Sequence, residues 1–412
     1  MKILWVKANK ILPLSSGGDI RSYYIARRLA SQHELAFLSY YDGPQDPSYE
    51  AELKSQFPSA MAICTGKRQG STLARGIDYV WRALKQTPYA VSRFECGRVR
   101  ELISTWFEER RADVAVCDFL DAVVNFPRNL TLPCVLFQHN VESEIWRRHA
   151  LTESNPAKRA MYRLESKKMI AYERSAVRNF QHVIAVSEHD AQLMCAWADS
   201  SHISIVPTGV DLERFRPDSQ ATMLAPLVMF VGAMDWEPNI DAVEYFCREV
   251  WPQIQSGIPG ARFRIVGRNP DRRVCRLVSE SIEVTGSVPS VVEHLREAAV
   301  VVVPLRIGGG TRLKIYEAMA MGKAVVSTTV GAEGLDVHHG QDIVLADEPN
   351  SFAEAVIRLL SDLPVRRRYE RSAAELAARY DWRAVADRFG YVLEKLLATG
   401  VVSTETCATV GI

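Results

Sequence analysis

The chain has 412 residues, with 50 lysines and arginines against 49 aspartates and glutamates and a formal net charge of +1. That length is too great for one typical hydrophobic core and sufficient for two. Proteins that bind nucleic acid usually carry a clear excess of positive charge, so the near-zero balance argues against that class of partner. A hydrophobic content of 47% is typical of a globular protein.

The cysteines and the apolar segments indicate where the protein works. None of the eight cysteines has Cys-x-x-Cys spacing, so we expect reduced thiols rather than a zinc site. Met1–Val6 is short and lacks a cleavage site, which predicts a first strand rather than a signal peptide. No stretch approaches the roughly 18 apolar residues of a membrane span. We therefore expect a cytoplasmic protein, either soluble or peripheral at the inner face of a membrane.

The chain begins with the pattern of a nucleotide-binding fold. A strand at Ile3–Val6, a loop that contains Gly17 and Gly18, a helix over about 20–31 and a strand from His33 follow one another. The loop predicts a close backbone approach to a ligand. A double glycine is equally consistent with a plain turn.

Two further strands are predicted at Asp113–Asp118 and Pro133–Phe137, after an arginine-rich and aromatic-rich stretch at 44–112 that we interpret as amphipathic helices. His139 follows the second strand. The carboxyl end of a parallel strand is where open α/β sheets bind ligands, so His139 is a candidate site residue. The alternative is an ordinary loop histidine.

A long helix predicted over 156–180 is strongly basic. It carries seven cations against two carboxylates, which are Lys158, Arg159, Arg163, Lys167, Lys168, Arg174 and Arg178 against Glu165 and Glu173. Such a face suits an anionic membrane surface or an anionic acceptor. A solvated helix face is the alternative.

The second half repeats the alternation of strands and helices. Pro207–Pro217 leads into a polar, proline-bounded stretch to Pro226, which indicates an interdomain linker. Leu227–Val231 opens the next sheet. The tail from Ala398 has small polar residues without a pattern, so we expect it to be disordered.

Residues 300–326 carry the strongest functional pattern. The run Val300–Val303 predicts a strand buried on both faces, and a helix follows over Arg312–Met321. Glycines between strand and helix leave free backbone N–H groups at the edge of the sheet, where a helix start attracts anions. The candidate binding residues of this turn are Gly308, Gly309, Gly310 and Thr311.

The side chains of the predicted helix indicate a nucleotide. Arg312 and Lys314 place two cations in the first turn, which the helix dipole disfavours unless an anionic ligand such as a diphosphate binds there. Glu317 lies on the same face as Lys314 and could accept two hydrogen bonds from a ribose diol. The alternative is a surface pair between Lys314 and Glu317.

These residues resemble the donor-binding signature of retaining glycosyltransferases of family 4, which have the GT-B fold. The family's usual motif is Glu-x7-Glu; Glu317 matches its second glutamate, which holds the ribose, and the first falls on Gly309. The stretch is similar to the Gly-Gly-Gly-Thr-Arg-Leu-Lys branch, in which backbone amides replace the first carboxylate. Pro207–Pro217 resembles the family's junction segment. Met234 and Asn239 stand near positions where many members carry cations, so Arg312 and Lys314 must meet the phosphate charge.

The resemblance implies an α/β fold of the GT-B type, with two Rossmann-like domains whose parallel sheets face across a cleft and a C-terminal helix that crosses back. The corresponding segments are an acceptor-binding domain at 1–208, a linker at 209–225, a donor-binding domain at 226–379, the returning helix at 380–397 and a disordered tail at 398–412. It implies a hexose transfer, with retention, from a UDP- or GDP-linked sugar to a hydroxyl of a glycan, lipid-linked or small-molecule acceptor. The implied catalytic residues are His139, Arg312 and Lys314, and the implied donor-binding residues are Gly17, Gly18, Gly308, Gly309, Gly310, Thr311, Arg312, Lys314 and Glu317. The sequence has no Asp-x-Asp metal clamp, so we expect no metal ion or other cofactor.

The N-terminal portion also looks like sugar transferases of bacterial exopolysaccharide gene clusters, through Gly18–Tyr23 and Glu144–Arg147. Two other function classes stay open. One is a GT-B epimerase or hydrolase that acts on a nucleotide sugar without an acceptor. The other is a non-catalytic GT-B subunit that binds a glycan.

Overall fold

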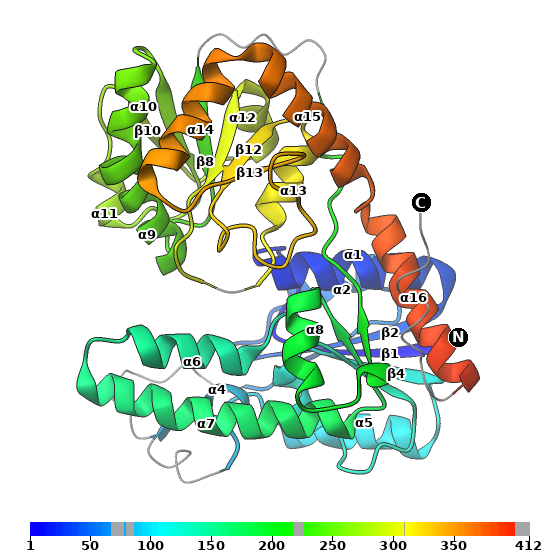
Figure 1. The fold of residues 1–412 in the computed structure, drawn as a ribbon. Helices are drawn as coiled ribbons and strands as arrows, with labels where there is room; N and C mark the ends of the chain where they lie inside the picture. Colours follow the sequence, from blue (N-terminus) through cyan, green and yellow to red (C-terminus); the bar gives the residue numbers. More distant parts are fainter. Residues whose placement is uncertain (67–77, 80–85, 218–225, 309, 400–412) are drawn as a thin grey trace. The chain divides into compact units, whose positions relative to one another are not determined.

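The computed structural model describes residues 1–66, 78–79, 86–217, 226–308 and 310–399. They form two compact units, which we call unit 1 (Met1–Pro207 with Val385–Ile412) and unit 2 (Thr208–Ala384) (Figure 1). Three expectations concern residues outside the described ranges: most of the linker (218–225), the tail beyond residue 399, and the role of Gly309.

The described residues of unit 1 form a sheet of seven parallel strands in the order β3-β2-β1-β4-β5-β6-β7. The strands are β1 (Lys2–Ala8), β2 (Glu34–Tyr41), β3 (Met61–Cys64), β4 (Val114–Asp118), β5 (Cys134–Phe137), β6 (His182–Ala185) and β7 (Ile203–Ile205). The helices are α1 (Gly17–Gln32), α2 (Pro47–Gln56), α4 (Tyr89–Ser92), α5 (Gly97–Glu108), η1 (Leu120–Asn125), α6 (Glu142–Thr152), α7 (Pro156–Asn179), α8 (Glu188–Cys195), η2 (Ser200–His202) and α16 (Trp382–Thr399).

Trp5 of β1 is the centre of an aromatic group that ties the C-terminal helix to this sheet. Its ring lies 6.4 Å from Phe37, 6.1 Å from Phe137 and 5.5 Å from Phe389 of α16, and all four side chains are buried. Such contacts stabilise beyond the area they bury. From Val385 onward α16 is therefore part of unit 1.

The described residues of unit 2 form a sheet of six parallel strands in the order β10-β9-β8-β11-β12-β13. The strands are β8 (Leu227–Val231), β9 (Arg262–Val266), β10 (Ile282–Gly286), β11 (Val300–Val303), β12 (Ala324–Ser327) and β13 (Val344–Leu345). The helices are α9 (Glu237–Tyr245), the π-helical turn η3 (Phe246–Val250), α10 (Trp251–Gly257), α11 (Arg272–Cys275), α12 (Val291–Glu297), α13 (Leu313–Ala320), α14 (Pro349–Ser361) and α15 (Leu363–Ala378).

The predicted α/β class with two parallel-sheet, Rossmann-like domains is confirmed. In each sheet the order reverses direction once, between β1 and β4 in unit 1 and between β8 and β11 in unit 2. Ligands of such sheets bind outside the carboxyl ends of the strands at this switch point. The fold thus directs attention to the loops after β1, β4 and β5 and after β8 and β11.

Local boundaries differ from the expectations at two places. Gly17 and Gly18 lie in the first turn of α1 rather than in a loop, because the Ser16 hydroxyl accepts the Asp19 N–H at 3.1 Å and caps the helix earlier. The start of the expected linker belongs to unit 2, where Val210 and Phe215 are buried in the core. Strand β3 was not expected within the stretch 44–112.

Two glycines let the ends of β8 and β9 approach each other. A Cβ atom on Gly267 would lie 1.6 Å from the carbonyl oxygen of Gly232, a distance that no side chain can occupy. A Cβ atom on Gly232 would lie 2.8 Å from the Lys314 ammonium. The close strand ends therefore leave room for that ammonium at the edge of the sheet.

We expect Gly267→Ala to destabilise unit 2 by about 2 kcal/mol or more, because the clash is with backbone and cannot be relieved by a rotamer change. The measurement is the midpoint of thermal unfolding, which should fall by roughly 5 °C or more. Gly97→Ala is the matched control, since a Cβ atom there meets nothing within 4 Å. Equal midpoints for the two variants would contradict the close approach.

Candidate active site

The predicted glycine turn of unit 2 ends at the start of α13. Gly308 and Gly310 have φ angles of 118° and 79°, a region that favours glycine. A Cβ atom on Gly308 would also come within 2.8 Å of a guanidinium nitrogen of Arg312. Arg312 occupies the N-cap position without a capping bond from its side chain, and Thr311 precedes it. The turn therefore places Arg312 against its own glycine backbone.

Lys314 is partly buried on the first turn of α13, against the end of β8. Its Nζ donates to Oδ1 of Asn239 at 3.0 Å and lies 4.3 Å from the ring centroid of Phe230. The Asn239 amide in turn donates to the carbonyl oxygen of Ala233 at 2.8 Å, which fixes its orientation. Burial and the nearby charge of Arg312 together lower the pKa of Lys314 to about 7, against the raising effect of Glu317.

Arg312 is buried, with 6% of its surface exposed. The guanidinium carbon lies 5.5 Å from the ring centroid of Trp236, a cation–π contact with an aromatic side chain that is itself 42% exposed. Trp236 is the N-cap residue of α9. The two switch-point loops of unit 2 thus contribute one cation and the aromatic surface that holds it.

Glu317 is partly buried one turn further along α13, and its side chain forms no hydrogen bond or ion pair within the part of the chain that the structure describes. Burial raises the pKa of its carboxyl group to about 7, while Arg214 and Lys314 lower it. The carboxyl group therefore keeps its hydrogen-bonding capacity for a ligand.

This cluster, which we call the unit 2 cluster, consists of Gly308, Gly310 to Lys314, Glu317, Trp236 and Asn239. Its cations exceed its carboxylates, and the first amides of α13 add partial positive charge. Phosphates bind at helix starts of this kind, particularly with an arginine that can bind two oxygens at once. The arrangement can hold a diphosphate, with a hydroxyl-binding carboxyl group beside it.

In unit 1 the structure brings His139 together with Gly18, where a Cβ atom would lie 3.8 Å from the imidazole ring. His139 Nδ1 lies 3.0 Å from a guanidinium nitrogen of Arg21. A guanidinium can only donate, so Nδ1 accepts and the ring proton is on Nε2. That proton is donated to Oδ1 of Asp118 at 2.7 Å. Both ring nitrogens are therefore engaged within unit 1.

Burial also keeps the imidazole neutral. It lowers the pKa of His139 to about 4, against the raising effect of Asp118. Burial alone would raise the pKa of Asp118, but Lys7 and His139 hold it well below its usual range. The Lys7 ammonium lies 3.6 Å from Asp118 and 3.5 Å from Asp19 at the start of α1. His139 thus belongs to a network of fixed protonation.

The unit 1 network has no excess of cations, unlike the unit 2 cluster. The Lys7 ammonium lies next to the carboxylates of Asp19 and Asp118. The negative charges of Asp190 and Asp118 act on the Arg21 guanidinium. With three carboxylates against two cations, this network can offer hydrogen bonds to a neutral polar ligand but gives no net attraction for a dianion. The Gly17 and Gly18 amides lie at the open start of α1 beside it.

The predicted site residues thus fall into two groups, with Gly17, Gly18 and His139 in unit 1 and the others in unit 2. Reasoning from the sequence missed Asn239, Lys7 and Asp118 as members. Asp118 and Lys7 carried a usable signal, because each is a charged residue near the carboxyl end of a buried strand. Asn239 stood near a cation position of the family, but nothing in the sequence indicated its contact with Lys314, which is 75 residues away.

Two negative findings apply to the described residues. They contain no group of three or more His, Cys, Asp and Glu side chains arranged to hold a metal ion. None of their helices combines the length and the apolar character that crossing a bilayer requires.

Two family models match the chain, and together they span most of it. The model described as glycosyltransferase family 4 matches residues 15–214, and the model described as glycosyl transferases group 1 matches residues 225–362. The first contains the unit 1 network except Lys7, and the second contains the whole unit 2 cluster.

Curated relatives are similar over part of the chain. A phosphatidyl-myo-inositol mannosyltransferase of Mycobacterium leprae is 26% identical over 211 residues, which are 47% of this chain and 54% of the relative. An exopolysaccharide phosphotransferase of Streptomyces coelicolor is 30% identical over 188 residues, 43% of this chain and 19% of that protein. The alignments thus span about half the length of the mannosyltransferase and less of the phosphotransferase.

Solved structures are similar over nearly the whole chain. Sucrose-phosphate synthase from Thermosynechococcus elongatus has a TM-score of 0.72 at 16% identity, covering 97% of this chain and 99% of the other. The Anabaena protein HepE in complex with UDP and glucose has a TM-score of 0.68 at 14% identity, covering 96% and 100%. These likenesses show the fold. The fold and the two family models together identify the chain as a glycosyltransferase of the GT-B fold, in family 4 and group 1.

Proposed function

We propose that the enzyme transfers a hexose from a UDP- or GDP-linked sugar to an acceptor hydroxyl, with retention of the anomeric configuration. The observation that carries the proposal is the unit 2 cluster. Cleavage of a sugar–diphosphate bond mainly requires stabilisation of the departing phosphate oxygens. Arg312, Lys314 and the first amides of α13 supply positive charge at one place, and Glu317 supplies acceptors for a ribose diol.

The similar proteins support a nucleotide sugar and a polysaccharide context. HepE of Anabaena was solved with UDP-glucose, and WaaG is described as a glycosyltransferase of lipopolysaccharide biosynthesis. The Streptomyces relative is named for exopolysaccharide. We therefore place the reaction in bacterial polysaccharide or glycoconjugate biosynthesis, with a glycan, lipid-linked or small-molecule acceptor.

The protonation state of His139 limits its role in this proposal. Its ring nitrogens are engaged by Arg21 and Asp118, so the neutral imidazole has no free position for accepting or releasing a proton. We assign it a place beside the donor sugar without a proton-transfer step. Retention itself rests on the resemblance to the family, and independence of a metal ion rests on the lack of an Asp-x-Asp clamp in the sequence.

A cytoplasmic location belongs to the same proposal. The cysteines that the structure describes are all free, which fits a reducing compartment.

Purified protein assayed with and without a chelator tests the metal-independent reaction directly.

Donor binding and product analysis test the function. A ligand that binds only the folded protein, present at a concentration about 100 times its Kd, stabilises the protein by about 2.7 kcal/mol. In a panel of UDP-, GDP- and ADP-sugars, the donor should therefore be the compound that raises the midpoint of thermal unfolding most. Incubation with donor alone then distinguishes transfer from epimerisation or hydrolysis. Complete conversion of the donor without an acceptor would contradict the transferase, and lack of binding to every nucleotide sugar would leave only a glycan-binding role.

We expect Lys314→Ala and Glu317→Ala each to reduce donor-dependent transfer by roughly a hundredfold or more, because each removes a contact to the donor. The midpoint of thermal unfolding should change little, because burial makes the charged form of each side chain costly in the free protein, and this cost offsets the contacts that the alanine variants lose. Glu354→Ala, which removes an exposed carboxylate from α14 of the same unit, is the control and should keep full activity. Full turnover in either cluster variant would exclude this site.

The pH dependence of kcat/KM for the donor should be bell-shaped with its maximum near pH 7. As the pH rises through about 7, Lys314 loses the charge that attracts the diphosphate. As the pH falls through about 7, Glu317 gains a proton and becomes a poorer acceptor. The two limbs belong to a coupled pair. The residual activity of Glu317→Gln should lack the acid limb, and a profile that is flat from pH 6 to 8 would contradict the assignment.

Asn239 is a positioning residue for Lys314, and its variants should move the alkaline limb in opposite directions. Asn239→Asp places a negative charge where the Oδ1 acceptor now lies, so it should raise the pKa of Lys314 and shift the limb upward by about one pH unit or more. Asn239→Ala removes the acceptor and should shift the limb downward. A purely structural role for Asn239 would change stability and leave the limb in place.

A further inference from the structure

The outward face of α7 in unit 1 has no carboxylate on it. The helix contains two, and both are buried, with Glu165 1% and Glu173 0% exposed. Glu165 accepts the N–H of Tyr89 at 2.7 Å. Glu173 accepts the N–H groups of Glu142 and Ser143 at 2.9 Å each, and so caps the start of α6 from the neighbouring helix. The charge count of the sequence therefore understates how basic the exposed face is.

The cations of this face are available to a partner. Arg163, Lys167 and Arg174 are exposed, and no hydrogen bond or ion pair joins them to any described residue. Their spacings of four and seven residues place them on one side of the helix. Arg159 and Arg178 lie along the same stripe and each donates to a backbone carbonyl oxygen.

Apolar side chains are exposed among these cations. Leu164 is 45% and Ile170 is 38% exposed on α7, and Leu151 at the end of α6 is 65% exposed. They are three of the nine large apolar side chains that are exposed in the described ranges, so exposed apolar residues are concentrated on α6 and α7. Exposed apolar residues between cations are typical of helices that lie in a membrane interface.

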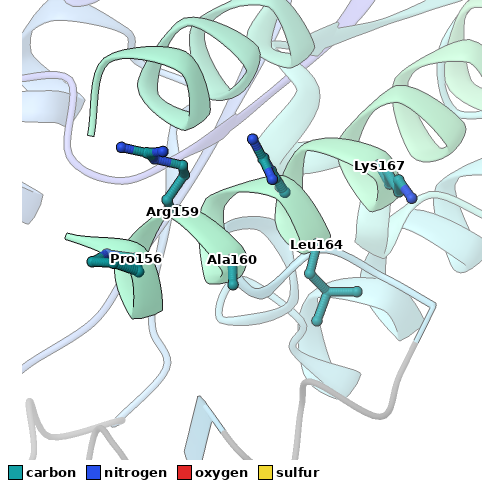
Figure 2. A pocket seen from close by; sticks show the side chains of 6 residues that line it. Pro156, Arg159, Ala160, Leu164 and Lys167 are labelled. Carbon is teal, nitrogen blue, oxygen red and sulfur yellow. The ribbon is translucent and has the colours of Figure 1, made fainter. Parts of the chain in front are cut away.

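A hollow of about 410 Å³ opens on the first half of α7 (Figure 2). Figure 2 shows the side chains of Arg159, Leu164 and Lys167 extending from this stretch of α7. The lining residues are Pro156, Arg159, Ala160, Arg163, Leu164 and Lys167. Three cations around apolar atoms fit a phosphate group that is joined to a glycerol and an acyl chain.

We propose that the outward face of α7, together with the end of α6, docks on a bilayer that contains anionic phospholipids. The cations bind lipid phosphates, with Arg163 and Lys167 at the hollow, and Leu151, Leu164 and Ile170 enter the boundary of the acyl chains. A nucleic acid or an acidic glycan would use the cations and leave the three aliphatic side chains without a role. The inference concerns a surface that is separate from the unit 2 cluster and does not depend on the proposed reaction.

Vesicle flotation with the full chain tests the docking. We expect binding to phosphatidylcholine vesicles that contain about 30 mol% phosphatidylglycerol and little binding to phosphatidylcholine alone. About 0.5 M NaCl should weaken the binding, because it screens the charges, and leave a residual fraction that rests on the apolar contacts. Equal binding to both kinds of vesicle, or to neither, overturns the proposal.

Two sets of variants assign the binding to α7. Arg163→Gln with Lys167→Gln and Arg174→Gln should lower partition into anionic vesicles by roughly tenfold or more. Leu164→Gln with Ile170→Gln keeps the charge and should remove the fraction that survives high salt.

Arg367→Gln with Arg371→Gln and Arg379→Gln is the matched control, because it removes three exposed cations from and beside α15 of unit 2. Donor binding should be unchanged in all three variants, which separates this test from that of the proposed function. Equal loss of vesicle binding in the control would show a nonspecific charge effect. Binding to heparin or RNA by a protein that ignores anionic vesicles would assign the face to a different partner.

Discussion

The site in unit 2 depends on keeping an ammonium group out of water. A buried lysine without compensation gives up its proton, since desolvation penalises the charged form. The surroundings of Lys314 compensate in part, through the Asn239 oxygen at 3.0 Å and the face of Phe230. Arg312 acts in the opposite direction. In the free protein Lys314 is therefore only partly protonated near neutral pH, and a bound anionic ligand would stabilise its charged form. Such a site is organised before its ligand arrives, which is how preorganised charge contributes to catalysis.

Close approaches of the backbone, rather than additional side chains, make room for the Lys314 ammonium. Gly232 and Gly267 bring the ends of β8 and β9 together and leave space for the ammonium. The glycine turn after β11 lets Arg312 pack against its own backbone at the start of α13. Because β8 and β11 are neighbours at the point where the strand order reverses, loops that are 75 residues apart in sequence meet at one edge. Parallel topology thus produces a charge cluster that no single segment contains.

The sequence allowed prediction of features that depend on local pattern. The valine run of β11, the start of α13 near Arg312 and the alternation of strands and helices all follow from residues that are adjacent in the chain. Features that depend on contacts between distant segments were not predictable in the same way. The side chain of Ser16 caps α1 so that the helix begins at Gly17. Val210 and Phe215, at the start of the expected linker, are buried in the core of unit 2, and Asn239 has its role through Lys314. Whether Gly17, Gly18 and His139 contact the donor stays a prediction.

A net charge of +1 conceals three different electrostatic environments in this chain. The unit 1 network has three carboxylates against two cations, and burial holds His139 neutral in one tautomer, so the network suits a neutral hydroxyl better than an anion. The unit 2 cluster has an excess of cations and therefore gains stabilisation from a diphosphate. The face of α7 obtains its excess differently, because Glu165 and Glu173 are used inside the unit. Interactions at that face are screened by salt far more than those of the buried groups. The same overall charge could therefore accompany a salt-sensitive association with a surface and a salt-resistant binding of a nucleotide sugar, and ionic strength is the variable that separates them.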